Sequence, residues 1–398
     1  MTQNSLLLEG LRVVDFGRFI AGPMCAAMLG DLGADVIRVE RVDGGDDRFQ
    51  YVTGPKGDNG AAFLQWNRNK RSLTLDPSLP GAREVLARLI RTADVVVANL
   101  PQSGMRQIGI DYESLKRLKS DVILVHATAF GTTGPYAERV GLDKVGQAMS
   151  GMNYLTGFGE CPTQSFASWV DCATGLFSAF GALAAIMHKR QTGEGQVVNT
   201  DLLRSALNVA SFTLIEEALT QRNRVATGNR HQASGPADTL KTRDGWILLQ
   251  CVGDSLFKRW ARLVGEESWI SDPRFQTDAL RAENGLILSE RSQQWAKDLT
   301  SEQALAQLAA ARIPAAPVLR PQEVLNDPHV RAGNYLKGLS YLGLLQPIEL
   351  IMPGIEMSAS PATIRNPPPT IGEHTQEILE ELGFSHVEIS DLRSRRVV

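Results

Sequence analysis

One aspartate stands alone in front of a long apolar segment. In WVDCATGLFSAFGALAAIMHKR, residues 169–190, Asp171 is the single acid, and residues 173–187 are all small or apolar. An aspartate directly before a helix commonly acts as its N-cap, which stabilises the helix start by about 1 kcal/mol. A carboxylate kept ionised by the positive end of a helix could also act as a nucleophile. The two roles are compatible, and the residues alone leave both open.

A second group of candidates is cationic. Arg68, Lys70 and Arg71 lie close together in NRNKR just before an expected strand, and Arg38 precedes Glu40 at the end of another. Cations at the carboxyl edge of a parallel sheet could bind phosphates, although such a cluster is more often a solvated face. Glu40 lies where dinucleotide-binding folds place a ribose-binding acid, but the GxGxxG motif is missing. We therefore expect a ligand with one adenosine-type half, or else a solvated acid at the end of this strand.

Other polar residues have simpler explanations. His126, inside the apolar VILVHATAF, is more typical of a hydrogen-bonded core histidine than of a base. Asp201 comes directly before a helix and is expected to be a plain N-cap. His188 and the two cations after it suit a helix C-terminus. The four cysteines form neither CxxC pairs nor zinc spacings with the six histidines, so no metal site is expected.

Composition limits the classes of function. The chain has 398 residues, 43% of them hydrophobic, with 41 basic and 44 acidic residues and no long basic run, so nucleic-acid binding has no support. The N-terminal stretch lacks the pattern of a signal peptide. The apolar run at 173–187 is shorter than the roughly 20 residues that cross a bilayer, which predicts a buried helix. Together with the scattered cysteines, these features predict a soluble, cytoplasmic protein without membrane partners.

The elements that must position these residues alternate between strands and helices. Apolar runs predict strands at 11–16, 34–40, 71–75, 95–100 and 121–130, with helices at 22–33, 81–93 and 112–119 between them. Strands that alternate with helices form a parallel, doubly wound sheet. The fold class is therefore α/β, with a Rossmann-like large domain.

The second half of the chain predicts a smaller α+β domain. The large domain is expected at 1–220, a polar linker at 221–236, the small domain at 237–312, a second linker at 313–330, and a segment at 331–398 that returns to the large domain. A hairpin is predicted around residues 243–245, and a helix follows the proline-rich stretch 361–374.

Several stretches, in order and at matching spacing, resemble the class III CoA-transferase family, also called CaiB/BaiF, which includes formyl-CoA transferases. They run from about residue 8 to 384 and comprise LEGLRVVDFGRFIAGP, LGADVIRVER, NRNKRSLTLD, QAMSGMNYLTG, SWVDCATG, KRQTGEGQVVNTDL, GNRH, DPRF and PPPTIGEHT. The resemblance implies ring-shaped subunits interlocked in a homodimer. It also implies that no cofactor is held permanently, and that coenzyme A and acyl-CoA are substrates.

The resemblance assigns roles residue by residue. Asp171 would attack the acyl-CoA thioester to give a mixed anhydride and CoA thiolate, and an aspartyl-CoA thioester would follow. The residues expected to contact coenzyme A or to lie near the active site are Arg18 and Phe19 at the pantetheine channel, Arg38 at the adenine, Lys70, Arg71 and Arg106 at the phosphates, and Asp143 beside the nucleophile.

Three departures from the family pattern bear on the function. Gln107 stands where the family commonly has an arginine, with Arg106 one place earlier, and only Gly253 represents a glycine run in the small domain. Leu142 stands where racemases of the family have a histidine. We therefore predict transfer of CoA to a carboxylic acid, short-chain or dicarboxylic. The alternatives are a 2-methylacyl-CoA racemase and a non-catalytic acyl-CoA-binding protein.

Overall fold

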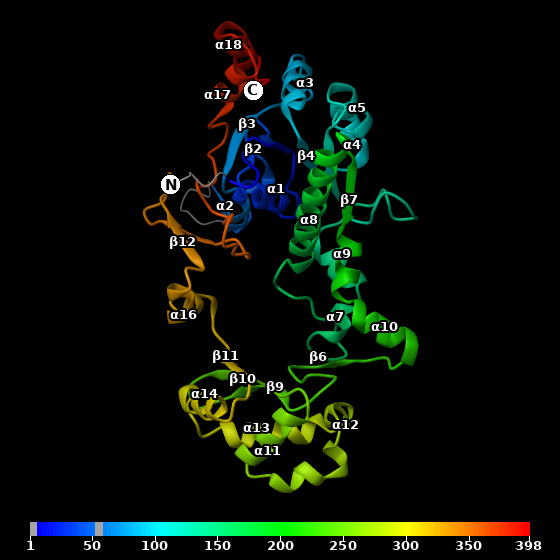
Figure 1. Cartoon of the computed structure of the whole chain (residues 1–398), viewed down its shortest axis with the longest axis vertical. Coiled ribbons are helices and arrows are strands. Elements are labelled where there is room, and N and C mark those ends of the chain that lie inside the picture. Colours follow the sequence, from blue (N-terminus) through cyan, green and yellow to red (C-terminus); the bar gives the residue numbers. More distant parts are fainter. Residues whose placement is uncertain (1–5, 52–58) are drawn as a thin grey trace. The chain divides into compact units, whose positions relative to one another are not determined.

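The computed structural model describes residues 6–51 and 59–398, so residues 1–5 and 52–58 of the predicted large domain lie outside the description (Figure 1). The chain divides into two compact units. Unit 1 comprises residues 1–150, 166–220 and 334–398, and unit 2 comprises residues 151–165 and 221–333.

Unit 1 is built on a six-stranded parallel sheet with the order β3-β2-β1-β4-β5-β7. Its strands are β1 (Arg12–Asp15), β2 (Asp35–Glu40), β3 (Lys70–Thr74), β4 (Val95–Ala98), β5 (Ile123–Thr128) and β7 (Val197–Asp201). The order reverses between β1 and β4, and in such sheets ligands bind outside the carboxyl ends of the strands at this point. The predicted α/β class with a parallel sheet is confirmed.

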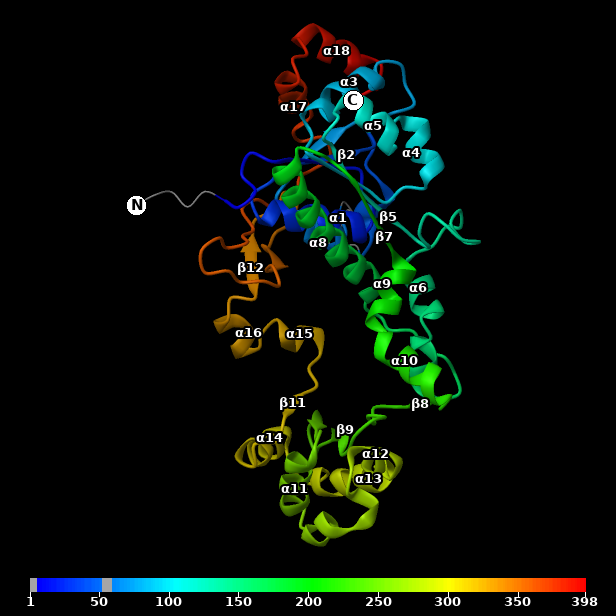
Figure 2. The same cartoon turned by 45° about the vertical axis from the view of Figure 1, so that its right-hand side comes forward.

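Helices cover both faces of this sheet (Figure 2). On one face, α1 (Ala21–Asp31) and α8 (Trp169–Thr192) bury residues such as Leu29, Ala182 and Ile186 against the valines of β1, β2 and β4. On the other face lie α3 (Ala82–Thr92), α4 (Gln102–Ile108) and α5 (Tyr112–Leu118), with Leu89 and Leu115 in their common core.

The small residues of α8 let it approach its neighbours closely. A Cβ on Gly175 would lie 3.0 Å from the Met24 side chain on α1, and one on Gly181 would lie 2.5 Å from Val198 on β7. By length and composition α8 could span a membrane. Here it lies on the sheet, with Ala179, Ala182 and Ile186 buried and the opposite face exposed. The small residues after Asp171 therefore allow α8 to pack closely on both a helix and a strand.

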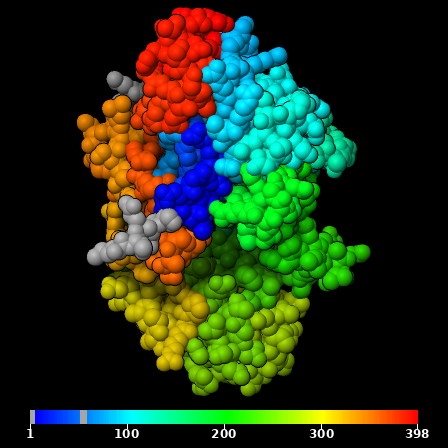
Figure 3. Space-filling model, turned by 45° about the horizontal axis from the view of Figure 1, so that its top comes forward, coloured from blue at the N-terminus to red at the C-terminus, as the bar shows by residue number. Residues whose placement is uncertain are grey.

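The end of the chain completes unit 1. After the hairpin β12 (Leu336–Leu339) and β13 (Ile348–Ile351), an extended segment leads to α17 (Thr375–Glu381) and α18 (His386–Ser394). Ile378, Leu382 and Leu392 join the core beneath α3, and the red segment lies beside the light-blue α3 region in Figure 3. Helix α18 was not among the predicted elements.

Five further elements belong to unit 1. They are η1 (Asp46–Phe49), α2 (Ala61–Trp66), α6 (Asp143–Met149), α9 (Leu202–Val209) and α10 (Ser211–Thr220). Helices α9 and α10 replace the single helix expected after Asp201. Asp201 itself is the N-cap of α9, as predicted, because its Oδ1 accepts a hydrogen bond of 2.6 Å from the Arg204 N–H.

Unit 2 has its own sheet and core. The predicted hairpin is present as β9 (Ala237–Lys241) and β10 (Trp246–Gln250), and β11 (Ala315–Pro317) pairs with β10. Trp260, Phe257 and Phe275 pack in the core. The other elements are α7 (Met152–Leu155), β6 (Phe158–Gly159), β8 (Ala226–Thr227), α11 (Asp254–Leu263), η2 (Glu267–Ser271), η3 (Pro273–Phe275), α12 (Asp278–Glu283), α13 (Gly285–Ala296), α14 (Ser301–Ala310), α15 (Pro321–Val324) and α16 (Pro328–Ala332).

The predicted domain boundaries need two corrections. Residues 151–165, placed in the large domain, belong to unit 2, where β6 pairs with β8. The stretches 221–236 and 313–330, expected as linkers, carry β8 and β11 and are also part of unit 2. Backbone pairing with distant strands gives these polar stretches their structure, and a local pattern does not show it.

Candidate active site

A cavity of about 320 Å³ opens beside the start of α8, and Asp171 lines it. The other walls come from the loop after β1 with Arg18 and Phe19, from the ends of β4 and β5, and from the loop 129–142. A cavity of this size suits a small ligand or part of a larger one. The sequence therefore places its isolated carboxylate at the edge of an open space.

Asp171 is the third residue of α8, and the N-cap is Ser168, so the prediction that Asp171 caps the helix is wrong. Burial is the main cause that raises the pKa of Asp171 to about 7, the negative charge of Asp143 raises it further, and Lys144 opposes both. The expectation that the helix end would keep this carboxylate ionised is therefore not met by the local electrostatics.

Asp143 takes the place that was predicted for Asp171. Its Oδ1 accepts hydrogen bonds from the backbone N–H of Val170 at 2.9 Å and of Asp171 at 3.0 Å. The capping carboxylate of α8 is thus supplied by α6, from 28 residues earlier in the chain. Asp143 is buried at 4% exposure, next to the residue that lines the cavity.

The loop that carries Arg18 is fixed to the end of β4. The Arg18 N–H donates to the Asn99 Oδ1 at 2.7 Å, and the Asn99 side-chain amide donates to the Arg18 carbonyl at 2.8 Å. Phe19 adopts a φ of 61°, which is uncommon for a residue other than glycine. Arg18 and Phe19 both line the cavity, as their predicted place in a substrate channel requires.

Two further side chains bear on the chemistry of this cavity. His126 lines it, and its Nε2 lies 3.0 Å from the Leu100 carbonyl, which as an acceptor requires a proton on that nitrogen. Burial lowers the pKa of His126. Leu142 also lines the cavity and can transfer no proton. His126 is therefore the imidazole that lines the cavity with Asp171.

A second cavity, of about 760 Å³, lies at the carboxyl edge of the sheet. Its walls include Phe16, Glu40 and Arg41 at the ends of β1 and β2, the turn 77–81 before α3, and Gly104, Gln107 and Ile108 on α4. It shares Arg18, Leu100 and Pro101 with the first cavity. The two cavities therefore adjoin at these three residues.

A family model described as CoA-transferase family III matches residues 8–375. The chain belongs to CoA-transferase family III. The family indicated by the sequence motifs is confirmed, and the chain is a CoA-transferase that moves CoA from an acyl-CoA thioester to a free carboxylic acid.

Relatives named as CoA-transferases are similar to this chain over nearly its whole length. The succinyl-CoA-L-malate CoA-transferase beta subunit of Chloroflexus aurantiacus is 32% identical over 100% of this chain and 99% of its own. The succinate-glutarate CoA-transferase of Agrobacterium fabrum is 33% identical over 94% of this chain and 95% of its own. A crystal structure of a CAIB/BAIF family protein from Brucella suis, 32% identical, has a TM-score of 0.83 and covers 96% of this chain and 100% of that chain.

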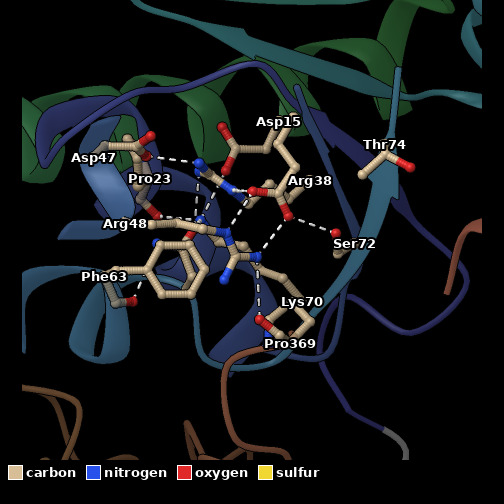
Figure 4. A network of polar contacts seen from close by, with 12 residues as sticks. Asp15, Pro23, Arg38, Asp47, Arg48, Phe63, Lys70, Ser72, Thr74 and Pro369 are labelled. Atoms are coloured by element: carbon tan, nitrogen blue, oxygen red, sulfur yellow. Dashed lines mark hydrogen bonds and ion pairs between the residues drawn. The ribbon is translucent and has the colours of Figure 1, made fainter. Parts of the chain in front are cut away.

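Two of the cations predicted to bind coenzyme A in this CoA-transferase, Lys70 and Arg38, are engaged in a buried network of polar contacts (Figure 4). The Lys70 Nζ donates to the Asp15 carboxylate at 2.7 Å, to the Pro23 carbonyl at 2.9 Å and to the Asn67 side chain at 2.9 Å, and the Lys70 side chain has no exposed surface. All three of its donors are used. Burial lowers the pKa of Lys70 to about 8, against the effect of Asp15.

Arg38 is buried in the same network. It donates to Asp47 at 2.6 Å and to the Gly17 carbonyl at 3.2 Å, and its guanidinium lies 5.2 Å from the centre of the Phe63 ring. Its side chain is fully buried, so the prediction that it stacks on or flanks an adenine needs correction. Arg38 instead joins β2 to the turn at Asp47.

Glu40, the candidate ribose-binding acid, belongs to this network too. Its two oxygens accept from Arg48 at 2.6 and 2.7 Å, and Ser72 donates to it at 2.6 Å. These hydrogen bonds and the charges of Arg48 and Arg38 outweigh burial and lower the pKa of Glu40. Its carboxylate is thus a structural anion.

Arg71 and Arg106 also depart from their predicted roles. Arg71 pairs with Asp35, Glu377 and Glu381 at 2.7 to 2.8 Å and so ties β2 and β3 to α17. Arg106 is exposed on α4 but does not line either cavity, whereas its neighbour Gln107 does. The sequence reasoning missed Arg41 and Arg83, the exposed cations that line the second cavity.

The described residues contain no group of three or more His, Cys, Asp or Glu side chains that could hold a metal ion.

Proposed function

We propose that this CoA-transferase exchanges CoA between a dicarboxylyl-CoA and a free dicarboxylic acid, with Asp171 as the nucleophile. The observation that carries the proposal is the position of Asp171 on a cavity that adjoins a larger one at the switch point of the sheet. The substrate class follows from the relatives whose names contain succinyl-CoA, malate, succinate and glutarate.

Coenzyme A fits the two cavities as a single elongated ligand. Its phosphate-bearing end would lie in the larger cavity, which Arg41 and Arg83 line. Arg83 lies in the first turn of α3. Arg41 pairs with Asp43 at 2.9 Å, but more than half of its side chain remains exposed. The pantetheine arm would pass Arg18, Leu100 and Pro101. The thioester would then reach Asp171 in the smaller cavity.

The reaction proceeds by covalent catalysis at Asp171. A carboxylate oxygen of Asp171 attacks the thioester carbonyl, so that a C–O bond forms, the C–S bond breaks and CoA leaves as a thiolate. The thiolate then attacks the aspartyl carbonyl of this anhydride, so that a C–S bond forms, the bond from that carbonyl carbon to the bridging oxygen breaks, the donor acid leaves as a free carboxylate, and an aspartyl-CoA thioester remains. The acceptor carboxylate reverses the two steps. No proton needs to be transferred at the carbon next to the thioester.

The cavity suits an anionic acceptor. Arg139 lines it and packs over the Tyr136 ring at 4.0 Å, and it forms no ion pair with any carboxylate in the described part of the chain. Its guanidinium can therefore offer a positive charge to the second carboxylate of a dicarboxylic acid.

A second copy of the chain completes the proposal. Leu176, Phe177 and Phe180 on α8 and Phe212 and Ile215 on α10 are exposed, and exposed apolar side chains of this kind mark surfaces that a partner covers. We propose a cytoplasmic homodimer of interlocked, ring-shaped subunits that binds coenzyme A and acyl-CoA as substrates and no resident cofactor. Sedimentation at nanomolar concentration should show a dimer; a folded monomer, or assembly only with a different subunit, would contradict this.

Trapping of the covalent intermediate tests the function. The enzyme is incubated with succinyl-CoA and then with hydroxylamine, and the peptides are analysed by mass spectrometry. We expect a hydroxamate on Asp171, and CoA transfer to dicarboxylic acids in preference to monocarboxylic acids of the same length. A hydroxamate on another acid, such as Asp143 or Asp201, would show that the nucleophile is assigned wrongly.

A further inference from the structure

The carboxylate of Asp171 faces the cavity without hydrogen-bond support. Within the described part of the chain, no backbone or side-chain group donates to it. This is unusual at a helix start, because the first backbone N–H groups of a helix have no partner within the helix and readily donate to a nearby carboxylate, which then caps the helix. The N–H groups that could stabilise the Asp171 carboxylate must therefore donate to other acceptors.

Asp143 is the acceptor of two of the first N–H groups of α8. Its Oδ1 accepts both the Val170 and the Asp171 N–H, at 2.9 and 3.0 Å, and the next N–H along the helix, that of Cys172, donates to the Ser168 carbonyl. One buried carboxylate thus neutralises the start of α8 and places its negative charge beside that of Asp171.

Helix α6 holds Asp143 in this position through several contacts. The Gln147 side chain donates to the Asp143 Oδ2 at 2.7 Å and to the Ala167 carbonyl at 2.9 Å. The Lys144 Nζ lies 3.2 Å from the Asp143 Oδ2 and donates to the Phe166 carbonyl at 3.0 Å. A Cβ on Gly146 would lie 2.8 Å from the Val170 side chain, so the glycine permits this close approach.

We propose that Asp143 is a positioning residue that takes up the free N–H groups of α8 and thereby leaves the Asp171 carboxylate unstabilised and reactive, while Lys144 moderates the effect. This inference rests on the proposed role of Asp171. A carboxylate that accepts few hydrogen bonds and has an anion beside it is more basic, and a more basic oxygen is a better nucleophile once it is ionised.

The surrounding charges define what a test must control. Asp143 and Lys144 on α6 act directly on Asp171, Cys172 follows it on α8, and Asp201 is the N-cap of α9. Arg18, His126, Glu138 and Arg139 line the same cavity. Asp143 and Lys144 have opposite charges, so the inference predicts opposite effects when each charge is removed.

The experiment compares Asp143→Asn and Lys144→Gln with the wild type in the pH dependence of kcat/KM for CoA transfer. Asparagine keeps an oxygen acceptor for the two N–H groups but removes the charge. In Asp143→Asn the acid limb should move to lower pH by about 0.5–1 unit. The rate at pH 8 to 9 should fall by about two- to threefold with KM changed little, because nucleophilicity falls less steeply than basicity. In Lys144→Gln the acid limb should move to higher pH.

The control is Asp111→Asn, at the N-cap of α5 and outside both cavities, whose profile should match the wild type. Unchanged profiles, or shifts in the same direction for both variants, would overturn the inference, and Lys144→Gln alone can do so if Asp143→Asn does not fold. Hydroxylamine labelling of each protein separates the two proposals. Labelled Asp171 with no opposite shifts refutes the role of Asp143, whereas absence of the label from Asp171 in the wild type refutes the nucleophile itself.

Discussion

Replacement of Asp171 by asparagine should abolish turnover and at the same time stabilise the protein. A carboxyl whose pKa rises from about 3.9 in the unfolded chain to about 7 in the fold costs the folded state about 4 kcal/mol once it is ionised. Water in the open cavity reduces this cost, so we expect about 1–3 kcal/mol of added stability in Asp171→Asn at pH 8. The amide cannot form the anhydride, and kcat should fall by at least about a thousandfold.

The pH dependence gives this prediction its sign. The folded pKa is raised, so the cost of Asp171 is absent below about pH 4, grows as the pH rises towards 7, and is constant above that. The gain in Tm of Asp171→Asn over the wild type should therefore be several degrees at pH 8 and close to zero at pH 4, in thermal scans at equal protein concentration. The matched control is Asp201→Asn, where asparagine can keep the cap of α9 and little change is expected. A variant that is no more stable than the wild type at pH 8, or equally stabilised at both pH values, would refute the reasoning.

Three other outcomes follow from the site. Arg41→Ala combined with Arg83→Ala should weaken binding of CoA more than that of dephospho-CoA in calorimetry, and equal weakening would place the phosphate elsewhere. Lys70→Ala leaves the buried Asp15 unpaired and should lower the free energy of unfolding by about 3–5 kcal/mol. The folded fraction of this variant should keep the wild-type preference for CoA over dephospho-CoA. A stable variant with an altered preference would show that Lys70 is a phosphate ligand. A 2-methylacyl-CoA of single configuration, incubated in deuterium oxide without an acceptor acid, should show neither inversion nor exchange at the 2-position in NMR, because Leu142 transfers no proton; racemisation would indicate that His126 acts as the second base.

The sequence predicts well where a structure depends on local patterns. The strands of the parallel sheet, the hairpin of unit 2 and the cap at Asp201 all follow from apolar periodicity or from a residue and its next few neighbours. The candidate nucleophile followed from an isolated acid and from family motifs, and the structure places it on a cavity.

The ion-pair partners of the charged residues could not be predicted from local patterns. Lys70 pairs with Asp15, 55 residues away, and Arg71 pairs with Glu381, 310 residues away, so NRNKR looks like a free cationic cluster although its members lie within ion-pair networks. The cap of α8 was assigned to the wrong aspartate for the same reason. An N-cap from the same helix is visible in sequence, whereas Asp143 reaches the helix only after the chain has folded back.

The return of the chain to unit 1 has a consequence for its synthesis on the ribosome. The core beneath α3 needs Ile378, Leu382 and Leu392, but residues 221–333 of unit 2 are translated first. The segment from residue 221 to Leu392 must be synthesised before this core can close, and at about 5–20 residues per second this takes roughly 9–34 s. For this time the part of this core that α17 and α18 cover is exposed in the nascent chain, although all strands of the sheet have been synthesised. Chaperone demand and translation speed across unit 2 should therefore govern the yield of this enzyme, and slow codons there should lower it.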